Sequence, residues 1–87
     1  MINIAIIDNE KMIRAQVVAK VRFLLGGMDA ETFVYGDGTT FLADIGEGKK
    51  FHIVISDTEL NGMSGIELGR QLKTLLPQVY LVYLTSI

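Results

Sequence analysis

Polar side chains stand directly after three apolar segments of this chain, and their types suit metal-assisted chemistry. Asp8-Asn9-Glu10 follows the first segment, Asp57 and then Glu59 follow the second, and Thr85-Ser86 follows the last. Two carboxylates held a few ångströms apart repel each other, and a hard divalent cation with oxygen ligands relieves that repulsion. Mg²⁺ is the natural candidate, because it often joins protein carboxylates to phosphoryl oxygens. A carboxylate in such a site can serve as the nucleophile of phosphoryl transfer.

The segments that must position these groups read as four strands. Residues 2–7 and 51–55 are largely apolar, as expected of strands buried in a parallel sheet, and residues 30–35 and 79–84 read as the second and fourth strands. Helical spacing of apolar residues predicts helices over residues 10–25, through Phe41, Leu42 and Ile45, and over residues 66–76. The chain therefore alternates strand and helix from its first residue to its last.

The helix ends carry signals of their own. We expect Gly26-Gly27 to close the first helix in the left-handed conformation, and Thr39 or Thr40 to cap the second. Pro77 should end the third. The basic residues of the first helix, Arg14 among them, are expected to stay in water.

This order predicts an α/β fold with a parallel sheet and right-handed crossovers. In such sheets ligands bind beyond the carboxyl ends of the strands, so the polar groups converge if the first, third and fourth strands are neighbours. The sequence stops at Ile87, at the tip of the last strand, with no helix left to cover the sheet. We interpret residues 1–87 as one truncated domain.

Composition narrows the range of functions. Apolar residues make up 49% and charged residues 21% of the chain, which is typical of a globular domain. The net charge of −2 argues against direct nucleic-acid contact. No apolar run is long enough to span a membrane, no signal peptide is present, and cysteine is absent, so we expect a cytoplasmic location.

Each candidate residue also has a plainer interpretation. Asp8 or Asn9 could simply cap the helix that follows, and Asp57 could be an ordinary turn residue after a strand. His52, the single histidine, begins a strand far in sequence from the polar groups, which indicates a structural role. Only the combination of acidic groups at several strand ends favours chemistry over turn formation.

The chain resembles the receiver domains of two-component response regulators. The resemblance rests on residues 4–10 (IAIIDNE), 53–57 (IVISD), 61–68 (NGMSGIEL) and 83–86 (YLTS), and it covers all 87 residues. Its most specific element is Asp57 followed eight residues later by Gly65. It implies a flavodoxin-like, doubly wound sheet of strand order 2-1-3-4 that lacks the family's last helix-strand-helix portion.

The resemblance also implies roles for individual residues. Asp57 matches the aspartate that accepts a phosphoryl group from a histidine kinase, and Thr85 matches the hydroxyl residue that senses it. Asp8, Asn9, Asp57 and the backbone carbonyl of Glu59 match the Mg²⁺ ligand positions. The implied protein is a phosphoacceptor that switches an output partner, with self-catalysed phosphoryl transfer and autodephosphorylation rather than enzymatic turnover. The loop at residues 61–63 resembles that of regulators with a DNA-binding output domain, which suggests transcription regulation.

Two departures from the family pattern bear on this interpretation. Asn9 stands where the family usually has a second acidic metal ligand, so Mg²⁺ should bind more weakly. The family's lysine lies on a fifth strand, before which this chain ends. An uncovered fourth strand is an exposed sheet edge, and we expect it to favour a homodimer.

Two other function classes remain open. A pseudo-receiver would keep the fold and bind a protein partner without being phosphorylated, and its affinity for Mg²⁺ would distinguish it. A fragment of a haloacid-dehalogenase-like phosphatase would also place an aspartate nucleophile after a strand. That family has a second aspartate where Glu59 stands, and it does not predict Asp8.

Overall fold

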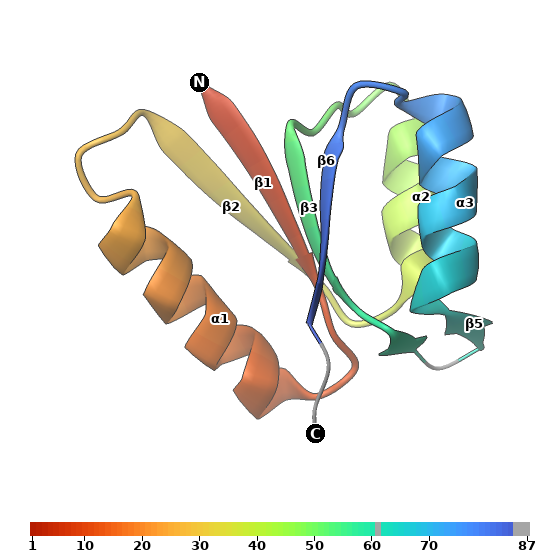
Figure 1. The fold of residues 1–87 in the computed structure, drawn as a ribbon, viewed down its shortest axis with the longest axis horizontal. Helices are drawn as coiled ribbons and strands as arrows, with labels where there is room; N and C mark the ends of the chain where they lie inside the picture. The colour runs from red at the N-terminus through yellow and green to blue at the C-terminus, as the bar shows by residue number, and fades with distance from the viewer. Residues whose placement is uncertain (61, 85–87) are drawn as a thin grey trace.

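The computed structural model describes residues 1–60 and 62–84 and contains a four-stranded parallel sheet (Figure 1). Its strands are β1 (Ile2–Ile7), β2 (Ala30–Tyr35), β3 (Ile53–Asp57) and β6 (Tyr80–Leu84), in the order β2-β1-β3-β6. The predicted α/β class and the predicted strand order 2-1-3-4 are confirmed. Strand β2 lies on one side of β1, and β3 and β6 lie on the other, so the sheet is doubly wound.

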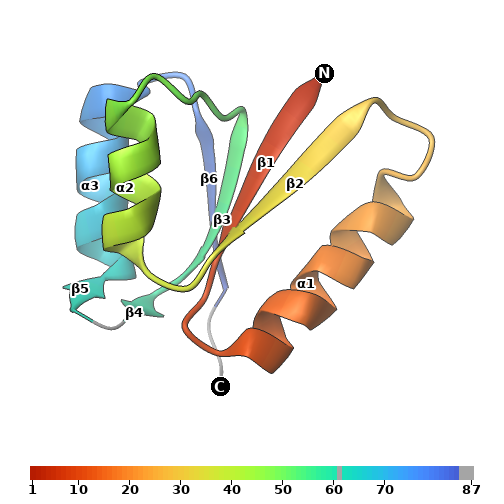
Figure 2. The ribbon, with the colours of Figure 1, turned by 180° about the vertical axis from the view of Figure 1, so that it is seen from behind.

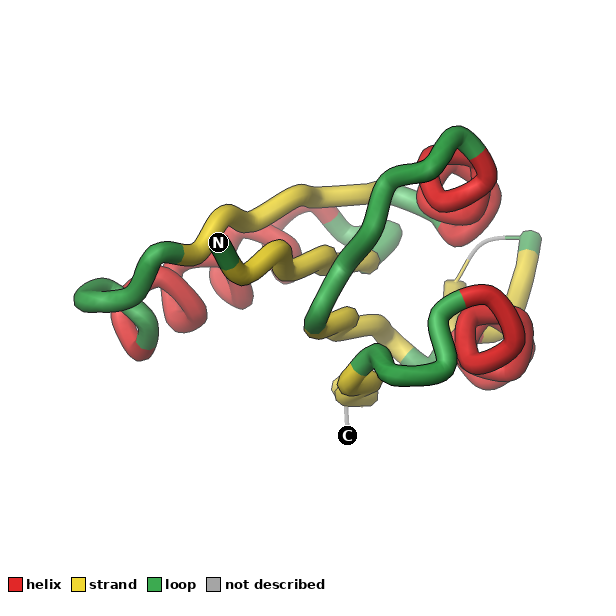
Figure 3. Tube along the Cα trace, turned by 90° about the horizontal axis from the view of Figure 1, so that it is seen from above, coloured by secondary structure: helices red, strands yellow, loops and turns green. Residues whose placement is uncertain are grey.

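Helices lie on both faces of the sheet. Helix α1 (Lys11–Leu24) lies on one face, and α2 (Gly38–Gly46) and α3 (Gly65–Leu75) lie together on the other (Figures 1 and 2). The view from above separates the two sides, with the sheet between α1 and the α2–α3 pair (Figure 3). Within the described residues no helix has the length and apolar character needed to cross a membrane.

The larger part of the core lies between the sheet and the α2–α3 pair. Alternate residues of the central strands point to this side, where Ala5, Ile7 and Val54 are buried. The remaining buried members come from the end of β2, both helices and the adjoining loops: Tyr35, Phe41, Ile45, Phe51, Leu68, Leu72 and Val79. The other side is thinner, because α1 contributes no buried residue although Ile4 and Ile6 beneath it are buried.

The ends of two helices differ from the sequence analysis. Helix α1 ends at Leu24, one residue before the expected end, and Gly26-Gly27 is not left-handed: within the described residues only Gly48 and Gly62 have positive φ. The last turn closes through the Leu25 N–H and the Val21 carbonyl, which needs no such conformation. Helix α2 is capped by Asp37, whose carboxylate accepts a hydrogen bond from the Thr40 N–H, so neither threonine is the cap.

A small hairpin occupies the segment between β3 and α3, where the sequence pattern predicts a loop. Strands β4 (Glu59–Leu60) and β5 (Met63–Ser64) pair antiparallel, with Glu59 opposite Ser64. Gly62 lies in the turn at φ +77°, where a residue with a side chain would be strained. Ser64 then caps α3 by accepting a hydrogen bond from the Glu67 N–H.

Candidate functional site

Asp8 directly follows β1, and several hydrogen bonds fix its position. Its N–H donates to the Tyr35 carbonyl at 3.1 Å, which continues the pairing of β1 with β2 by one residue. Its Oδ1 accepts a hydrogen bond from the Glu10 N–H at 2.8 Å. Asp8 is only 5% exposed, and no hydrogen bond from the described residues reaches its Oδ2. The backbone therefore holds one carboxylate oxygen of Asp8, and the other oxygen is available to bind a ligand.

The capping alternative holds only in part. Neither Asp8 nor Asn9 is the N-cap of α1, because Glu10 occupies that position without a side-chain hydrogen bond. Asp8 instead binds the N–H of the capping residue itself. The side chains of Asn9 and Glu10 are exposed, and the structure gives neither of them a hydrogen bond to the acidic residues.

Arg14 is a site residue, although the amphipathic pattern of its helix predicts that it stays in water. It is half-buried, and its Nη1 donates to the Asp8 carbonyl oxygen at 2.6 Å. The guanidinium group also lies beside Gly36, 3.4 Å from where a β-carbon would be placed there. The signal available in the sequence was spacing: Arg14 is one helical turn beyond Glu10, which begins the helix after Asp8. Arg14 thus fixes the backbone of the acidic residue.

Asp57 is the last residue of β3, and its carboxylate is held in the same way as that of Asp8. Its Oδ1 accepts a hydrogen bond from the N–H two residues ahead, that of Glu59, at 3.1 Å. This is the pattern of an Asx turn, so the turn role of Asp57 is real. The Asp57 carbonyl accepts a hydrogen bond from the buried Ser56 Oγ at 2.8 Å. The side chain itself is half-buried, so its carboxylate can be reached from solvent.

The register of the sheet brings the two aspartates together. Strands β1 and β3 are hydrogen-bonded neighbours, and Ile7 pairs with Ser56. Asp8 and Asp57 each come one residue later, at the carboxyl ends of adjacent strands, where neighbouring strands lie about 4.8 Å apart. The expected convergence of these two acidic groups is therefore present in the backbone.

Gly65 fixes the segment after Asp57 by close contact. Its N–H donates to the Thr58 carbonyl at 2.9 Å. A β-carbon at Gly65 would overlap the Asp57 carbonyl oxygen and would lie 2.8 Å from the Thr58 Cα. Only glycine permits this approach of the start of α3 to the end of β3. The spacing of eight residues between Asp57 and Gly65 thus has a steric reason.

The few oxygen donors at the carboxyl ends of β1 and β3 suit a hard cation. Asp8 and Asp57 contribute carboxylate oxygens, and neither forms an ion pair with a described residue. Within residues 1–60 and 62–84, no three His, Cys, Asp or Glu side chains gather as metal ligands. Oxygen donors and uncompensated negative charge fit Mg²⁺. The neutral Asn9 leaves the side-chain donors at two carboxylates rather than three.

The remaining expected site residue, Thr85, lies outside the described residues. Its neighbour Leu84 pairs with Asp57, so the described part of β6 runs beside the end of β3. His52, which we expected to be structural, is exposed at the other end of β3, where its Nδ1 accepts a hydrogen bond from the Asn3 N–H.

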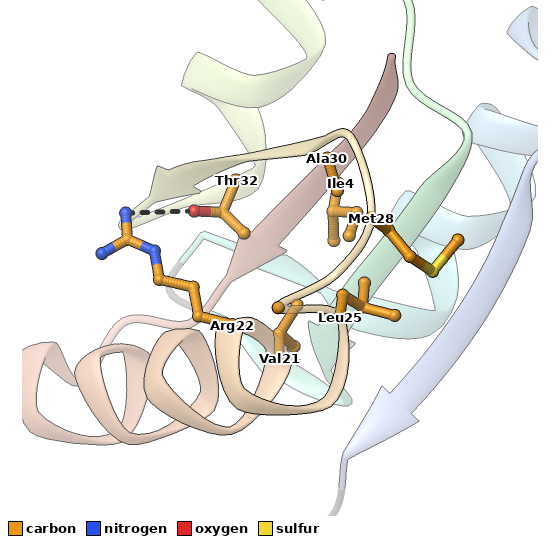
Figure 4. Close-up of a pocket in the computed structure, with 8 residues that line it drawn as sticks. Ile4, Val21, Arg22, Leu25, Met28, Ala30 and Thr32 are labelled. Carbon is orange, nitrogen blue, oxygen red and sulfur yellow. Dashed lines mark hydrogen bonds between the residues drawn. The ribbon is translucent and has the colours of Figure 1, made fainter.

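A cavity of about 300 Å³ lies far from the acidic edge, between the carboxyl end of α1 and the first residues of β2 (Figure 4). Ile4, Val21, Leu25 and Met28 line it, and Arg22 donates a long hydrogen bond of 3.4 Å to Thr32 at its rim. Asp8 stands at the opposite end of α1. The cavity therefore takes no part in the candidate site.

Comparison with known proteins shows what the chain is similar to. The sequence model of a family described as "Response regulator receiver domain" matches residues 4–87. DrrB of Thermotoga maritima, described as an OmpR/PhoB homolog, is 30% identical with a TM-score of 0.84, and the match covers 100% of this chain but 36% of that one. A structure of the BeF3-activated DrrB receiver domain gives the same identity and TM-score and is covered to 68%.

A second relative supports the fold alone. TrrA of Thermotoga maritima, in complex with Mg²⁺-BeF, is 23% identical with a TM-score of 0.85, over 100% of this chain and 71% of that one. TrrA has also been solved in complex with the histidine kinase ThkA, with 22% identity, a TM-score of 0.82 and coverage of 99% and 70%. No curated protein matches this chain.

Proposed function

This chain belongs to the family of response regulator receiver domains, and from that premise we propose that Asp57 accepts a phosphoryl group from a histidine kinase. One observation carries the proposal. Asp57 and Asp8 stand at the carboxyl ends of adjacent strands, and each has one oxygen fixed by a backbone N–H two residues ahead. Two oriented carboxylates that form no ion pair with a described residue suit a metal-assisted phosphoacceptor.

The residues proposed to hold Mg²⁺ are Asp8, Asp57 and the backbone carbonyl of Glu59, with Asn9 in the position of a weaker ligand. Bound there, Mg²⁺ would supply neutralisation of the carboxylates and of the phosphoryl oxygens. The protein's own part is orientation. Arg14 holds the Asp8 backbone, and the Glu59 N–H fixes Oδ1 of Asp57. That TrrA was solved with Mg²⁺-BeF supports the choice of cation.

The proposed step is a displacement at phosphorus. A carboxylate oxygen of Asp57 forms a bond to the phosphorus of a phosphohistidine, and the bond between phosphorus and the histidine nitrogen breaks. The nitrogen leaves with the electron pair, and Asp57 becomes an acyl phosphate. Hydrolysis of that acyl phosphate, by attack of water, returns the carboxylate and releases inorganic phosphate. The module therefore switches between two states without being an enzyme in the usual sense.

The partners and location follow the same proposal. A histidine kinase is the proposed donor, which the complex of TrrA with ThkA supports. Thr85 is proposed to sense the phosphoryl group. The output partner, any role in transcription and the activity of a longer protein remain proposals, because the chain spans about a third of the DrrB chain it matches. A single receiver domain over residues 1–87, the absence of direct nucleic-acid contact and a cytoplasmic location also stay predictions.

The deciding experiment is phosphorylation by a small donor. The purified chain is incubated with acetyl phosphate and MgCl₂, and intact mass is recorded. We expect one added phosphoryl group on the wild type, none on Asp57→Asn, and none when a chelator removes the Mg²⁺. A phosphoryl group on both the wild type and Asp57→Asn would show that a residue other than Asp57 accepts it. A phosphoryl group on neither protein would refute phosphoacceptance by this chain.

A second function is favoured by one observation. Asn9 is neutral and exposed, and the described residues supply only two carboxylates to the edge. A pseudo-receiver that binds a partner without phosphorylation would show no saturable Mg²⁺ binding. Titration with Mg²⁺, followed by the NMR shifts of the Asp8 and Asp57 amides, separates the two functions. Saturation with shifts at both amides favours the phosphoacceptor.

A further inference from the structure

Tyr83 makes a side-chain contact that the proposed phosphoacceptor role does not yet use. It lies on β6, and its hydroxyl donates a hydrogen bond to the Gly65 carbonyl oxygen at 3.0 Å, across 18 residues of sequence. Gly65 is the first residue of α3. The bond therefore joins the fourth strand of the sheet to the start of the last helix.

The space around this hydroxyl is fitted to it. A β-carbon at Gly69, one turn further along α3, would overlap the Tyr83 hydroxyl and would lie 3.2 Å from its Cζ. Gly69 is buried, so this slot lies within the packed layer between β6 and α3. Burial raises the pKa of the Tyr83 hydroxyl. A phenylalanine would fill the slot without making the bond.

The acceptor of this bond, Gly65, also contacts the Asp57 segment. The Gly65 N–H donates to the Thr58 carbonyl, and a β-carbon at Gly65 would overlap the Asp57 carbonyl oxygen. On the sheet side, Tyr83 pairs with Ser56, whose Oγ donates to that same Asp57 oxygen. Tyr83 thus lies beside both groups that hold the Asp57 backbone.

We propose that Tyr83 is a positioning residue for the phosphoacceptor: through Gly65 it fixes the segment from Asp57 to Glu59 relative to the end of β6. The inference rests on the proposed function, because positioning matters chemically only if Asp57 reacts. A purely structural tyrosine would contribute to the stability of the whole domain. A positioning tyrosine also controls the local order of one segment and the rate at which Asp57 reacts.

The test compares Tyr83→Phe with a matched control, Tyr80→Phe. Tyr80 lies on the same strand but is 75% exposed, and no side-chain hydrogen bond joins it to the described residues. Amide hydrogen exchange is measured by NMR at Glu59 and Gly65 and at the core residues Ala5 and Val54. The rate of phosphorylation by acetyl phosphate is measured over a range of Mg²⁺ concentrations, so that the maximal rate and the half-saturating Mg²⁺ concentration are separated.

We expect Tyr83→Phe to speed exchange at Glu59 and Gly65 by about fivefold more than at the core residues, the effect of losing one hydrogen bond of average strength. The maximal rate of phosphorylation should fall by a similar factor, while Tyr80→Phe changes neither quantity. Equal acceleration at all four amides, or an unchanged maximal rate in a phosphorylatable protein, would overturn the inference. If the wild type takes no phosphoryl group at all, the proposed function fails and the positioning role with it, and the exchange pattern then decides only whether Tyr83 orders the segment from Asp57 to Glu59.

Discussion

At the scale of single residues, the most demanding position is Gly65, because backbone rather than side-chain atoms surround it. Gly65→Ala places a methyl group against the Asp57 carbonyl and the Thr58 Cα, neither of which can rotate away. We expect a loss of about 1–3 kcal/mol in the free energy of unfolding, as for other overpacked sites. Urea unfolding monitored by circular dichroism measures it.

The control for this substitution is Gly46→Ala. Gly46 is also helical, at the end of α2, but a β-carbon there would meet nothing within 4 Å. Its φ is not in the left-handed region, so alanine should leave stability unchanged or raise it by up to about 1 kcal/mol. Equal losses in both variants would show that the effect at Gly65 does not come from its contact with the Asp57 carbonyl and the Thr58 Cα.

Residues of the site differed in how far they could be predicted. Asp8 and Asp57 could be found because each directly follows an apolar strand, and position at a strand end depends only on the local pattern. Arg14 and Tyr83 could not, because each bonds to a backbone carbonyl of another element. Such contacts depend on how a long side chain crosses between elements. A pattern of polar and apolar residues places Arg14 in water and Tyr83 merely in a strand.

At the scale of elements, the cap of α2 makes stability depend on pH. The backbone N–H of Thr40 lowers the pKa of Asp37 below its ordinary value of 3.8. Because the pKa of Asp37 is lower in the folded chain than in the unfolded chain, its ionised carboxylate stabilises the folded protein. This stabilisation is fully present above the unfolded pKa and is lost as pH falls through the folded pKa. Asp37→Asn keeps a capping oxygen but removes the titrating charge.

We therefore expect wild type to be more stable than Asp37→Asn near neutral pH, and the difference to vanish as pH falls below 3.8. Thermal unfolding of both proteins across this pH range measures the difference. Other acidic groups titrate equally in both proteins and cancel. A difference that persists unchanged in acid would show that shape, and not the charge of Asp37, stabilises the start of α2.

The elements themselves were predicted to within a few residues where a pattern was long enough to read. Strands β1 and β2 have six residues each and helix α1 has 14 residues, which is long enough for a strand or a helix to be recognised. Strands β4 and β5 have two residues each, too few for any periodicity, and their pairing depends on the turn at Gly62. The cap of α2 was missed because Asp37, Thr39 and Thr40 are all plausible caps, and only the geometry selects among them.

At the scale of the whole molecule, the two faces of the sheet are covered unequally. Helices α2 and α3 bury one face, whereas α1 lies over β1 and β2 and leaves the outer part of the other face open (Figures 1 and 3). Tyr80, Val82 and Leu84 alternate along β6 and are exposed on this open side. Strand β6 also pairs only with β3 among the described strands, so its outer edge has unpaired backbone groups.

An apolar strand at an open edge is a template for pairing with a second copy. We therefore predict that this chain forms a homodimer through β6, and that Val82→Lys shifts it to monomer by placing a charge in the middle of the joined strands. Sedimentation velocity at increasing protein concentration measures the shift. Phe23→Lys is the matched control, because Phe23 is 86% exposed on α1, away from β6. Dissociation by Phe23→Lys but not by Val82→Lys would place the interface on α1, and a wild type that stays monomeric would refute association through the edge.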